Sequence, residues 1–543
     1  MKMPYITKKN LEDLDIPFIF ERLQLFSPYG EKLKKCLAPF KRHQVAELEK
    51  SYDQLEAAIG LLINNRLELL ALKGLLKEVK LLDHTFDRIA ENEVLSMTEL
   101  FEVKQLVRVM ENIRDAQSKL YWQKRIGAFN LTEVSNVTKL LDPEQSGVQA
   151  FHIYSQYSAK LYEIRKAIDS VDIKIKLKQK ELIEELILEG YQVSSHGELK
   201  VLSRDVDLLS KIKSDPRFSY KSDVPMYTIF TVRIETTLTA EKQNLLLEEE
   251  QEEYEVRSQL TSALKAYLEI ITSNTDAIAQ IDVLIAKSQF SVAFNCVRPM
   301  ILEMGQVEIE EGRHLKVAYS LGKVGKQFTP INVSLKKSVT LITGANMGGK
   351  TVSLKMIGQV VNLAQYGFFV PCKSLKMPLF DFVFVSVGDF QSIDMGLSTF
   401  GGEIVEIEEA IKRSDEYGLI LIDELARGTN PLEGFAISKA LIEFLKNQMS
   451  KAVITTHFDG LTDVEDTVHY QVKGLSDVDL TLIRDKIEAE GAALLHEYMD
   501  YQLMEVSSYK EIPKEAIRIS ELMGLDTRIV DRAKEILGGS NDE

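Results

Sequence analysis

The stretch Leu341-Ile-Thr-Gly-Ala-Asn-Met-Gly-Gly-Lys-Thr351 predicts the fold of the domain around it. Apolar runs lie before and after it, so we expect a strand, a glycine-rich turn and a helix. Gly344 and Gly349 allow the backbone to curl with its N–H groups toward phosphates. Lys350 supplies a cation for the β- and γ-phosphates, and the Thr351 hydroxyl is placed to ligate Mg²⁺. The stretch therefore predicts a phosphate-binding loop, with an ordinary glycine-rich turn as the weaker alternative.

Length and composition bound the class of protein. The chain has 543 residues, 45% hydrophobic and 27% charged, enough for about three domain-sized units. We expect no membrane span, because no run of about 18 apolar residues is present, and no signal peptide, because the start lacks a long apolar core. The three cysteines form no C-x-x-C pair, which predicts neither a zinc site nor a disulfide framework. A reducing cytoplasmic location fits best.

The net charge of −16 bears on the choice of partner. A protein whose main task is to bind DNA phosphates usually carries a basic footprint. The charge therefore counts against DNA binding, although a local basic patch could still exist in an acidic chain.

The first half of the chain is predicted to be helical. Proline is absent from Glu144 to Asp215 and from Met226 to Arg298, and glycine from Glu198 to Met304. In Ala240–Phe290 a stripe at alternating spacings of four and three indicates one long helix, broken once by Asn274. We interpret the stripe as a packing seam against another helix, with a coiled-coil dimer interface as the alternative. Its members are Leu260, Leu264, Tyr267, Ile271, Asn274, Ile278, Ile281 and Ile285.

Residues 190–237 differ in composition from the helical segments on either side. They contain two prolines, several serines and the β-prone run Tyr227–Ile234, so we predict a small inserted element at the tip of a helical arm. Ten acids and seven bases over residues 181–240 indicate that this element is not a basic clamp. The acidic run Glu248–Glu255 is interpreted as a solvated face, which would repel a nucleic acid lying along it.

From about Val297 onward, strand-like and helical runs alternate. This pattern predicts an α/β domain with a mainly parallel sheet, so the fold class is α+α/β. We expect a long-helix core and lever domain over residues 1–296 and a phosphate-loop domain with a helical tail over 297–543. The predicted strands are Ser338–Thr343, Phe382–Val387, Gly418–Ile422 and Ala452–Thr456, the predicted helices begin at Lys350, Gly402 and Leu432, and the tail helix is Pro513–Leu537.

Polar residues follow three of the predicted strands. Asp423 at the end of a buried strand can hold Mg²⁺, and Glu424, pointing to the opposite face, can orient the attacking water. His457 could contact the γ-phosphate, and Gln391 could sense metal or water. We therefore predict Glu424, Lys350 and His457 as catalytic residues, with Thr351 and Asp423 as metal ligands. The alternative is a set of strands with ordinary polar ends.

The ordered set of motifs resembles the ATPase domain of MutS proteins, a branch of the ABC-type ATPases. A weaker resemblance covers Phe18–Lys34, the long helix and the tail. The matching segments are Gly312-Arg-His314, Phe328-Thr-Pro330, Gly344–Thr351, Gly388-Asp-Phe-Gln-Ser-Ile393, Leu397-Ser-Thr-Phe400, Asp423-Glu-Leu-Ala-Arg-Gly-Thr429 and Thr455-Thr-His-Phe458.

The resemblance implies a homodimer in which ATP and Mg²⁺ lie between two ATPase domains. Phe328 would stack on adenine, Ser398 would reach the nucleotide of the partner subunit, and Arg427 would lie near the dimer seam. Ser398 and Thr399 can also cap a helix whose start is an anion site. With the loop, the implied nucleotide-binding set is Phe328, Gly344, Ala345, Asn346, Met347, Gly348, Gly349, Lys350, Thr351, Val352, Gln391 and Ser398.

The sequence also departs from the family pattern. The chain opens at the helical core, so we expect no mismatch-reading or connector domain before it, and no nuclease-like domain after the ATPase. Ala345 stands where the family usually has proline, and the loop resembles the recombination-suppressing bacterial branch. Two hypotheses follow. One is a DNA-maintenance ATPase that binds nucleic acid between its helical arms. The other is an ATP-driven remodeller of a protein client, similar to the reactivase of cobalamin-dependent lysine 5,6-aminomutase.

Overall fold

The computed structural model describes most of the chain as two compact units. The predicted division into residues 1–296 and 297–543 rests on sequence texture and stays a prediction. The first unit comprises Met1–Lys77, Ala116–Asn130 and Ala277–Glu543, and the second comprises Glu78–Asp115 and Leu131–Asp276. The described residues are 4–144, 151–233, 236–344, 349–387, 399–426, 429–458, 460–474, 500–506, 517, 520–521 and 524–539.

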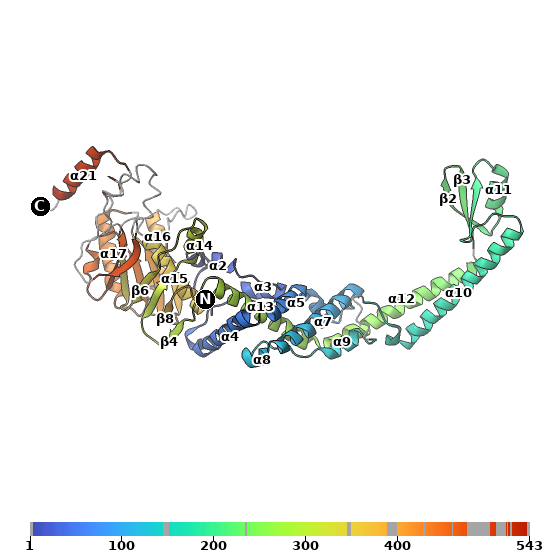
Figure 1. Cartoon of the computed structure of the whole chain (residues 1–543), viewed down its shortest axis with the longest axis horizontal. Coiled ribbons are helices and arrows are strands. Elements are labelled where there is room, and N and C mark those ends of the chain that lie inside the picture. Colours follow the sequence, from blue (N-terminus) through green and yellow to red (C-terminus); the bar gives the residue numbers. More distant parts are fainter. Residues whose placement is uncertain are drawn as a thin grey trace. The chain divides into compact units, whose positions relative to one another are not determined.

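The first unit contains a six-stranded sheet (Figure 1). Its strands are β7 (Val339–Thr343), β9 (Phe382–Ser386), β10 (Gly418–Asp423), β11 (Lys451–Thr455), β12 (Val468–Gly474) and β13 (Asp500–Glu505). Their order is β13-β12-β7-β11-β10-β9, all parallel except β13, which is antiparallel to β12. The sequence-based expectation of a mainly parallel sheet is confirmed, and with it the α+α/β fold class. Because β7, β11 and β10 are parallel neighbours, their carboxyl ends lie together at one edge of the sheet.

A second sheet of four short strands was not predicted. Its strands are β4 (Met300–Leu302), β5 (Val307–Gly312), β6 (Ile331–Leu335) and β8 (Ser374–Pro378), in the order β4-β8-β5-β6. The short helix α14 (Leu315–Lys323) connects β5 to β6. Strands of three to six residues with mixed burial carry little periodic signal, which is why the sequence did not reveal them.

Helix α15 (Lys350–Gln365) is the central helix of the first unit. Thirteen of its 16 residues are buried, and the three that are not are Thr351, Val352 and Lys355. Gly358 permits close packing, because a Cβ atom there would lie 2.5 Å from Leu14 Cδ2 and 2.7 Å from Leu421 Cδ1. The helix begins at Lys350 as predicted. It is buried on all sides except at its first turns.

The C-terminal end of α15 is capped by other segments of the same unit. Tyr52 on α4 (Val45–Asn64) donates its hydroxyl to Ala364 O at 2.6 Å. The ammonium of Lys287 on α13 (Leu268–Ala293) donates to Tyr366 O at 2.8 Å and Gly367 O at 3.1 Å. Burial lowers the pKa of Lys287 to about 7. These contacts satisfy carbonyl groups that a helix end leaves without intrahelical partners.

The remaining helices of the first unit vary from one turn to several. In the described part of the chain, no helix has both the length and the apolar character that crossing a membrane requires. Two helices start close to the predicted positions Gly402 and Leu432. The helices are α1 (Lys8–Asp13), α2 (Ile16–Phe20), α3 (Pro28–Lys35), α5 (Arg66–Glu78), α8 (Trp122–Arg125), α16 (Thr399–Ile411), α17 (Pro431–Leu445) and α21 (Thr527–Gly539), the last being the described end of the predicted tail helix.

In the second unit, two 30-residue helices lie side by side and a small sheet lies at their far end (Figure 1). The helices are α10 (Ala159–Leu188) and α12 (Thr236–Lys265), and α9 (Ser135–Leu141) is shorter. The segment marked as an inserted element contains β1 (Glu198–Leu202), α11 (Val206–Ser214), β2 (Phe218–Val224) and β3 (Tyr227–Val232), with strand order β1-β3-β2. It packs a small apolar core of its own against the end of α10.

The predicted continuous helix Ala240–Phe290 is wrong, because a turn at Ala266 and Tyr267 separates α12 from α13. The stripe residues on both helices are nevertheless largely buried within the chain, which supports the packing seam over the coiled-coil alternative. Asn274 does not break the helix. It accepts from Thr132 N at 2.8 Å and donates to Thr132 O at 2.9 Å, so this buried amide serves the backbone of a neighbouring segment.

The acidic run of α12 is not simply a solvated face. Glu249 and Glu253 each bind the guanidinium of Arg165 on α10, at 2.8 and 2.7 Å. Glu252 pairs with Lys160 at 2.8 Å. Part of the negative charge that would repel a nucleic acid is therefore balanced by cations from the neighbouring helix.

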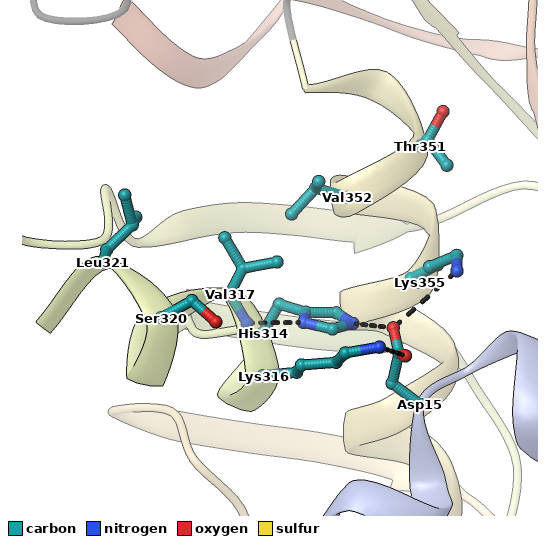
Figure 2. Close-up of a pocket in the computed structure, with 9 residues that line it drawn as sticks. All are labelled: Asp15, His314, Lys316, Val317, Ser320, Leu321, Thr351, Val352 and Lys355. Carbon is teal, nitrogen blue, oxygen red and sulfur yellow. Dashed lines mark hydrogen bonds and ion pairs between the residues drawn. The ribbon is translucent and has the colours of Figure 1, made fainter. Parts of the chain in front are cut away.

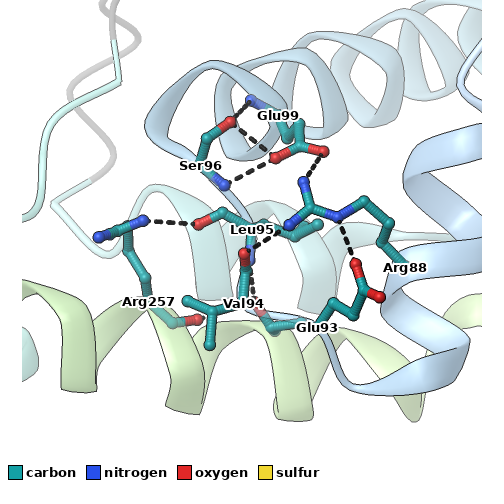
Figure 3. Close-up of polar contacts among 8 residues, drawn as sticks. Arg88, Glu93, Val94, Leu95, Ser96, Glu99 and Arg257 are labelled. Atoms are coloured by element: carbon teal, nitrogen blue, oxygen red, sulfur yellow. Dashed lines mark hydrogen bonds and ion pairs between the residues drawn. The ribbon is translucent and has the colours of Figure 1, made fainter.

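Polar contacts bind the link between two further helices to α12 (Figure 3). The link joins α6 (Asp83–Glu91) to α7 (Met97–Lys119). Arg88 on α6 contacts carboxylates from the link and from α7. Leu95 accepts from Arg257 Nη1 at 3.1 Å and donates its N–H to a threonine hydroxyl of α12, also at 3.1 Å. These bonds fix where α7 begins relative to α12.

Replacing Asn274 by leucine should destabilise the second unit. The variant leaves the N–H and C=O of Thr132 without the amide that serves them, a loss of about 1–3 kcal/mol. The measurement is the urea concentration at the unfolding midpoint, with the exposed Asn64→Leu as control. An Asn274→Leu midpoint equal to that of the control would contradict this role.

Candidate nucleotide-binding site

The glycines at the two ends of the predicted loop occupy positions that require glycine. Gly344 has φ of 137° and Gly349 has φ of 87°. A Cβ atom on Gly349 would lie 2.9 Å from Cδ1 of Tyr501, and one on Gly344 would lie 3.0 Å from Cβ of Val472. Side chains of β12 and β13 therefore press against the loop, a contact that the sequence did not reveal. The loop residues Ala345, Asn346, Met347 and Gly348 lie outside the described residues.

Lys350, the first residue of α15, forms an ion pair with Glu424. The distance from Nζ to Oε1 is 3.0 Å, and both side chains are largely buried. Nζ also donates to Gly344 O at 2.8 Å. The cation predicted for phosphates is therefore neutralised by the carboxylate predicted as the base. A phosphate that binds Lys350 must compete with Glu424 for the same ammonium.

Asp423, at the end of β10, receives hydrogen bonds from two threonines. Thr351 Oγ1 donates to Oδ2 at 2.8 Å, and Thr455 Oγ1 donates to Oδ1 at 2.6 Å. A hydroxyl and a carboxylate are hard oxygen ligands of the kind Mg²⁺ prefers, with water completing its coordination. The predicted pair Thr351 and Asp423 is therefore brought together, and its chemistry fits Mg²⁺.

The backbone at Glu424 departs from strand geometry. Its φ is 50°, in the left-handed region, and its N–H donates to the Thr455 hydroxyl at 3.0 Å. The expectation that Glu424 points away from Asp423 is wrong, because this turn breaks the alternation of side chains along a strand. Both acids instead reach the start of α15, Asp423 through Thr351 and Glu424 through Lys350.

His457 follows β11 and lies near the same carboxylate. Its Nδ1 is 3.9 Å from Glu424 Oε2, too long for a hydrogen bond, and its side chain is 46% exposed. The ring packs against Phe458, with 4.5 Å between centroids. The structure thus places Lys350, Glu424 and His457 in one cluster. Their assignment as catalytic residues stays a prediction.

A pocket of about 450 Å³ lies between α14 and the first turns of α15 (Figure 2). Gln359 holds the two helices together, because its amide accepts from Leu315 N at 2.9 Å and donates to Leu14 O at 3.1 Å. The pocket volume falls in the range of small-molecule sites. Its lining residues are Asp15, His314, Lys316, Val317, Ser320, Leu321, Thr351, Val352 and Lys355.

Asp15 is a site residue that the sequence analysis missed. It lies between α1 and α2 with φ of 55°, and its carboxylate faces three basic side chains (Figure 2). Lys316 bonds to Oδ1, while His314 Nε2 and Lys355 Nζ lie 3.6 and 3.7 Å from Oδ2. About 300 residues or more separate Asp15 from these partners in sequence. No local pattern could have predicted the contact.

Of the remaining predicted residues, the structure describes Val352 and Phe328. Val352 lines the pocket. Phe328 is half-buried in the segment between α14 and β6, so its predicted stacking on adenine stays a prediction. Gln391, Ser398 and Arg427 lie outside the described residues.

Comparison with known proteins identifies the domain that carries this site. The family model for MutS domain V matches residues 340–539. The endonuclease MutS2 of Acetivibrio thermocellus is 27% identical over 469 residues, covering 83% of this chain and 55% of that protein. The endonuclease MutS2 of Caldicellulosiruptor bescii is 30% identical over 327 residues, covering 59% of this chain and 40% of that protein. The DNA mismatch repair protein MutS of Listeria monocytogenes is 28% identical over 305 residues, covering 55% and 33% respectively.

Residues 340–539 match the MutS domain V family, and the chain is similar to MutS and MutS2 proteins over a longer stretch. The resemblance inferred from its motifs is confirmed. The chain spans between 33% and 55% of the lengths of these three relatives.

The buried histidine of the pocket should make this protein sensitive to acid. Burial lowers the pKa of His314 to about 4; Asp15 opposes the shift, and Lys355 and Lys316 add to it. Unfolded His314 takes up a proton near pH 6.5, which the folded site resists, so stability falls as the pH drops from about 6.5 toward 4. The loss at pH 5 is about 2 kcal/mol.

The measurement is the thermal unfolding midpoint at about pH 7.5 and about pH 5, for the wild type and His314→Asn. Asparagine keeps an acceptor for the N–H of Val317 but does not titrate. We expect the acid-induced drop to be smaller in the variant. Equal drops in the two proteins would show that His314 does not titrate as described.

Proposed function

We propose that this MutS-family chain binds ATP at the start of α15 and hydrolyses it. The observation that carries the proposal is the convergence of two elements on one point. Lys350 and Thr351 from α15 contact Glu424 and Asp423 from the end of β10, at 3.0 and 2.8 Å. A cation for phosphates, a metal-ligand pair and a base candidate are the parts that phosphoryl transfer needs. The positive end of the α15 dipole points at the same place.

The proposed mechanism assigns one task to each side chain. Lys350 leaves Glu424 and binds the phosphates. The freed Glu424 carboxylate accepts a proton from the attacking water and orients its oxygen toward the γ-phosphate. Thr351 and Asp423 would hold Mg²⁺, which supplies charge neutralisation on the β- and γ-phosphates when bound. Thr455 keeps Asp423 oriented through its hydrogen bond of 2.6 Å.

We further propose a homodimer with the nucleotide shared between two ATPase domains. The support is the family assignment, together with the motif residues Ser398 and Arg427. In this proposal ATP favours the closed pair, since only that state makes both sets of phosphate contacts, and hydrolysis releases it. The closed pair would hold the helical arms in one arrangement.

The client that we propose first is DNA, in a maintenance role. The support is that the relatives carry the names endonuclease MutS2 and DNA mismatch repair protein MutS. A protein client, such as a cobalamin-dependent aminomutase, is the second candidate, and the net charge of −16 favours it. Lys160 and Arg165 pair with the acidic run and balance part of its negative charge. The negative charge is therefore a weaker argument against DNA binding along the arms. A cytoplasmic location is part of either proposal.

Glu424→Gln should separate binding from hydrolysis. Glutamine cannot take the proton, so turnover should fall by about 10²- to 10⁴-fold. It also leaves Lys350 without its competing carboxylate, so ATP should bind at least as tightly as in the wild type. Lys350→Ala should instead weaken ATP binding by about 10- to 100-fold, because it removes a charged donor to phosphate.

The measurements are steady-state phosphate release and equilibrium binding of Mg·ATP, with the exposed Glu443→Gln as the matched control. Normal turnover in Glu424→Gln would remove this residue from the mechanism. Normal Mg·ATP binding and normal phosphate release in Lys350→Ala would contradict the proposed ATP site.

Binding to DNA should show the salt dependence of phosphate contacts. If DNA is the client, the logarithm of the binding constant should fall linearly with the logarithm of salt concentration. The titration uses branched and linear duplexes with and without ATP, and Lys350→Ala serves as the nucleotide-insensitive control. Failure to bind either duplex at about 50 mM salt, in both nucleotide states, would favour a protein client.

A further inference from the structure

We propose that the buried ammonium of Lys287 and a phosphate group bound at the start of α15 stabilise each other through that helix, so that protonation of Lys287 regulates nucleotide binding. The inference rests on the proposed function, because it takes the phosphates to be those of ATP. Lys287 lies on α13 and contacts the end of α15 opposite to Lys350. We assign it a regulatory role from a distance and not a catalytic one.

The C-terminal end of α15 has two carbonyl groups that Lys287 serves. The backbone N–H groups of Gly367, Phe368 and Phe40 bind the three carbonyls before them, at 2.9, 3.0 and 2.8 Å. Tyr366 O and Gly367 O instead accept from Lys287 Nζ, at 2.8 and 3.1 Å. The last carbonyls of a helix carry partial negative charge, so a cation at this end is favourable.

Lys287 is a buried cation with no carboxylate beside it. Its exposed fraction is 7%, and it forms no ion pair with any residue that the structure describes. Its ammonium lies 4.3 Å from the centre of the Phe368 ring, which attracts a cation. Burial lowers the pKa of Lys287 to about 7. Near neutral pH both forms are therefore present, and a small change in the local potential shifts the balance between them.

The other titratable groups around Lys287 are neutral or have other partners. Asp282, on the same helix, accepts two hydrogen bonds of 2.7 Å at the N-terminal end of α3. Burial raises the pKa of Tyr52 and of Tyr366, so both hydroxyls stay protonated near pH 7. Three carboxylates of α4 pair with Arg298, and three further charged groups are exposed. The carboxylates are Glu49, Asp53 and Glu56, and the exposed groups are Lys41, Glu47 and Lys50.

Helix α15 connects the two charged positions electrostatically. It has 16 residues, which gives a length of about 24 Å, and 13 of them are buried. An anion at its start and a cation at its end are both stabilised by the helix dipole. At an effective dielectric constant of about 20, one negative charge at the start attracts Lys287 enough to change affinity about threefold. Because Lys350 and Glu424 neutralise each other, the charge that changes on binding is that of the ligand.

The size of the effect should follow the charge of the ligand. The magnesium complex of ATP has a net charge of about −2 and that of ADP about −1, so protonated Lys287 should strengthen binding about tenfold and about threefold respectively. The linkage is reciprocal, so bound nucleotide raises the pKa of Lys287 and the protein takes up protons as it binds. Affinity should therefore fall as the pH rises from about 6 to about 9, because Lys287 loses its charge in that range.

The test counts the protons taken up on binding. Calorimetric titration of a Mg²⁺-bound, non-hydrolysable ATP analogue in two buffers of different ionisation enthalpy gives this number for the wild type, Lys287→Met and the control Lys412→Met, whose side chain is 61% exposed. At about pH 7.5 we expect the wild type and the control to take up about half a proton more than Lys287→Met. We also expect the fall in affinity between about pH 6 and about pH 9 to be about tenfold larger in the wild type than in Lys287→Met, and about threefold larger with Mg·ADP.

Two results with the variant would overturn the inference. One is equal proton uptake by the wild type and Lys287→Met. The other is weaker binding by Lys287→Met at every pH with an unchanged proton number, which would show that Lys287 only supports the packing of α15. If Lys287→Met does not fold, the wild type decides alone: a fall in affinity of about tenfold between about pH 6 and about pH 9 supports the inference, and a constant affinity contradicts it. Failure of the wild type to bind the analogue at any pH would instead overturn the proposed function.

Discussion

Helix α15 is buried along most of its length, and the first unit is arranged to satisfy its two ends. At the C-terminal end, carbonyl groups accept from Tyr52 and from the buried ammonium of Lys287. At Gly358 there is no room for a Cβ atom, so packing against Leu14 and Leu421 holds the helix in place. At the N-terminal end, the first N–H groups and the helix dipole favour an anion. The proposed nucleotide binding builds on this constraint.

The pair between Lys350 and Glu424 is the second consequence. A buried charge is costly unless it is paired, and these two groups pair with each other. Without phosphates, the pair neutralises itself at 3.0 Å. In the proposed mechanism, phosphates would replace the carboxylate at Lys350 and leave Glu424 as a strong acceptor beside Thr351 and Asp423. Binding of substrate and release of the base would then be one exchange of partners.

The parts of this site that could be predicted from the sequence are those encoded by short, contiguous patterns. Gly349, Lys350, Thr351 and Asp423 were found because the spacing of a strand, a loop and a helix fixes where they lie. The direction of the Glu424 side chain was predicted wrongly. The prediction assumed that side chains alternate along a strand, and the left-handed backbone of Glu424 at the strand end breaks that alternation. Asp15 was missed for a different reason. It enters the site through tertiary packing, with Gln359 joining segments more than 300 residues apart.

The fold shows the same division. The central parallel strands have strong apolar runs and were predicted, whereas the strands of the four-stranded sheet are of similar length but mix buried and exposed residues. The apolar stripe on α12 and α13 was predicted because the helical spacing continues across a two-residue turn. The turn itself, at Ala266 and Tyr267, was not predicted. Asn274 was taken as a break because a polar residue disturbs an apolar stripe. Its actual function is to bind the backbone of Thr132.

The central claim is that bound phosphates take Lys350 from Glu424 at the start of α15. The most direct measurement is an experimental structure of the protein with Mg²⁺ and a non-hydrolysable ATP analogue. The account predicts phosphate oxygens within hydrogen-bond distance of Lys350 Nζ, with the Glu424 carboxylate moved away from that ammonium and toward the γ-phosphate. A structure in which the 3.0 Å pair persists while the analogue binds elsewhere would contradict it.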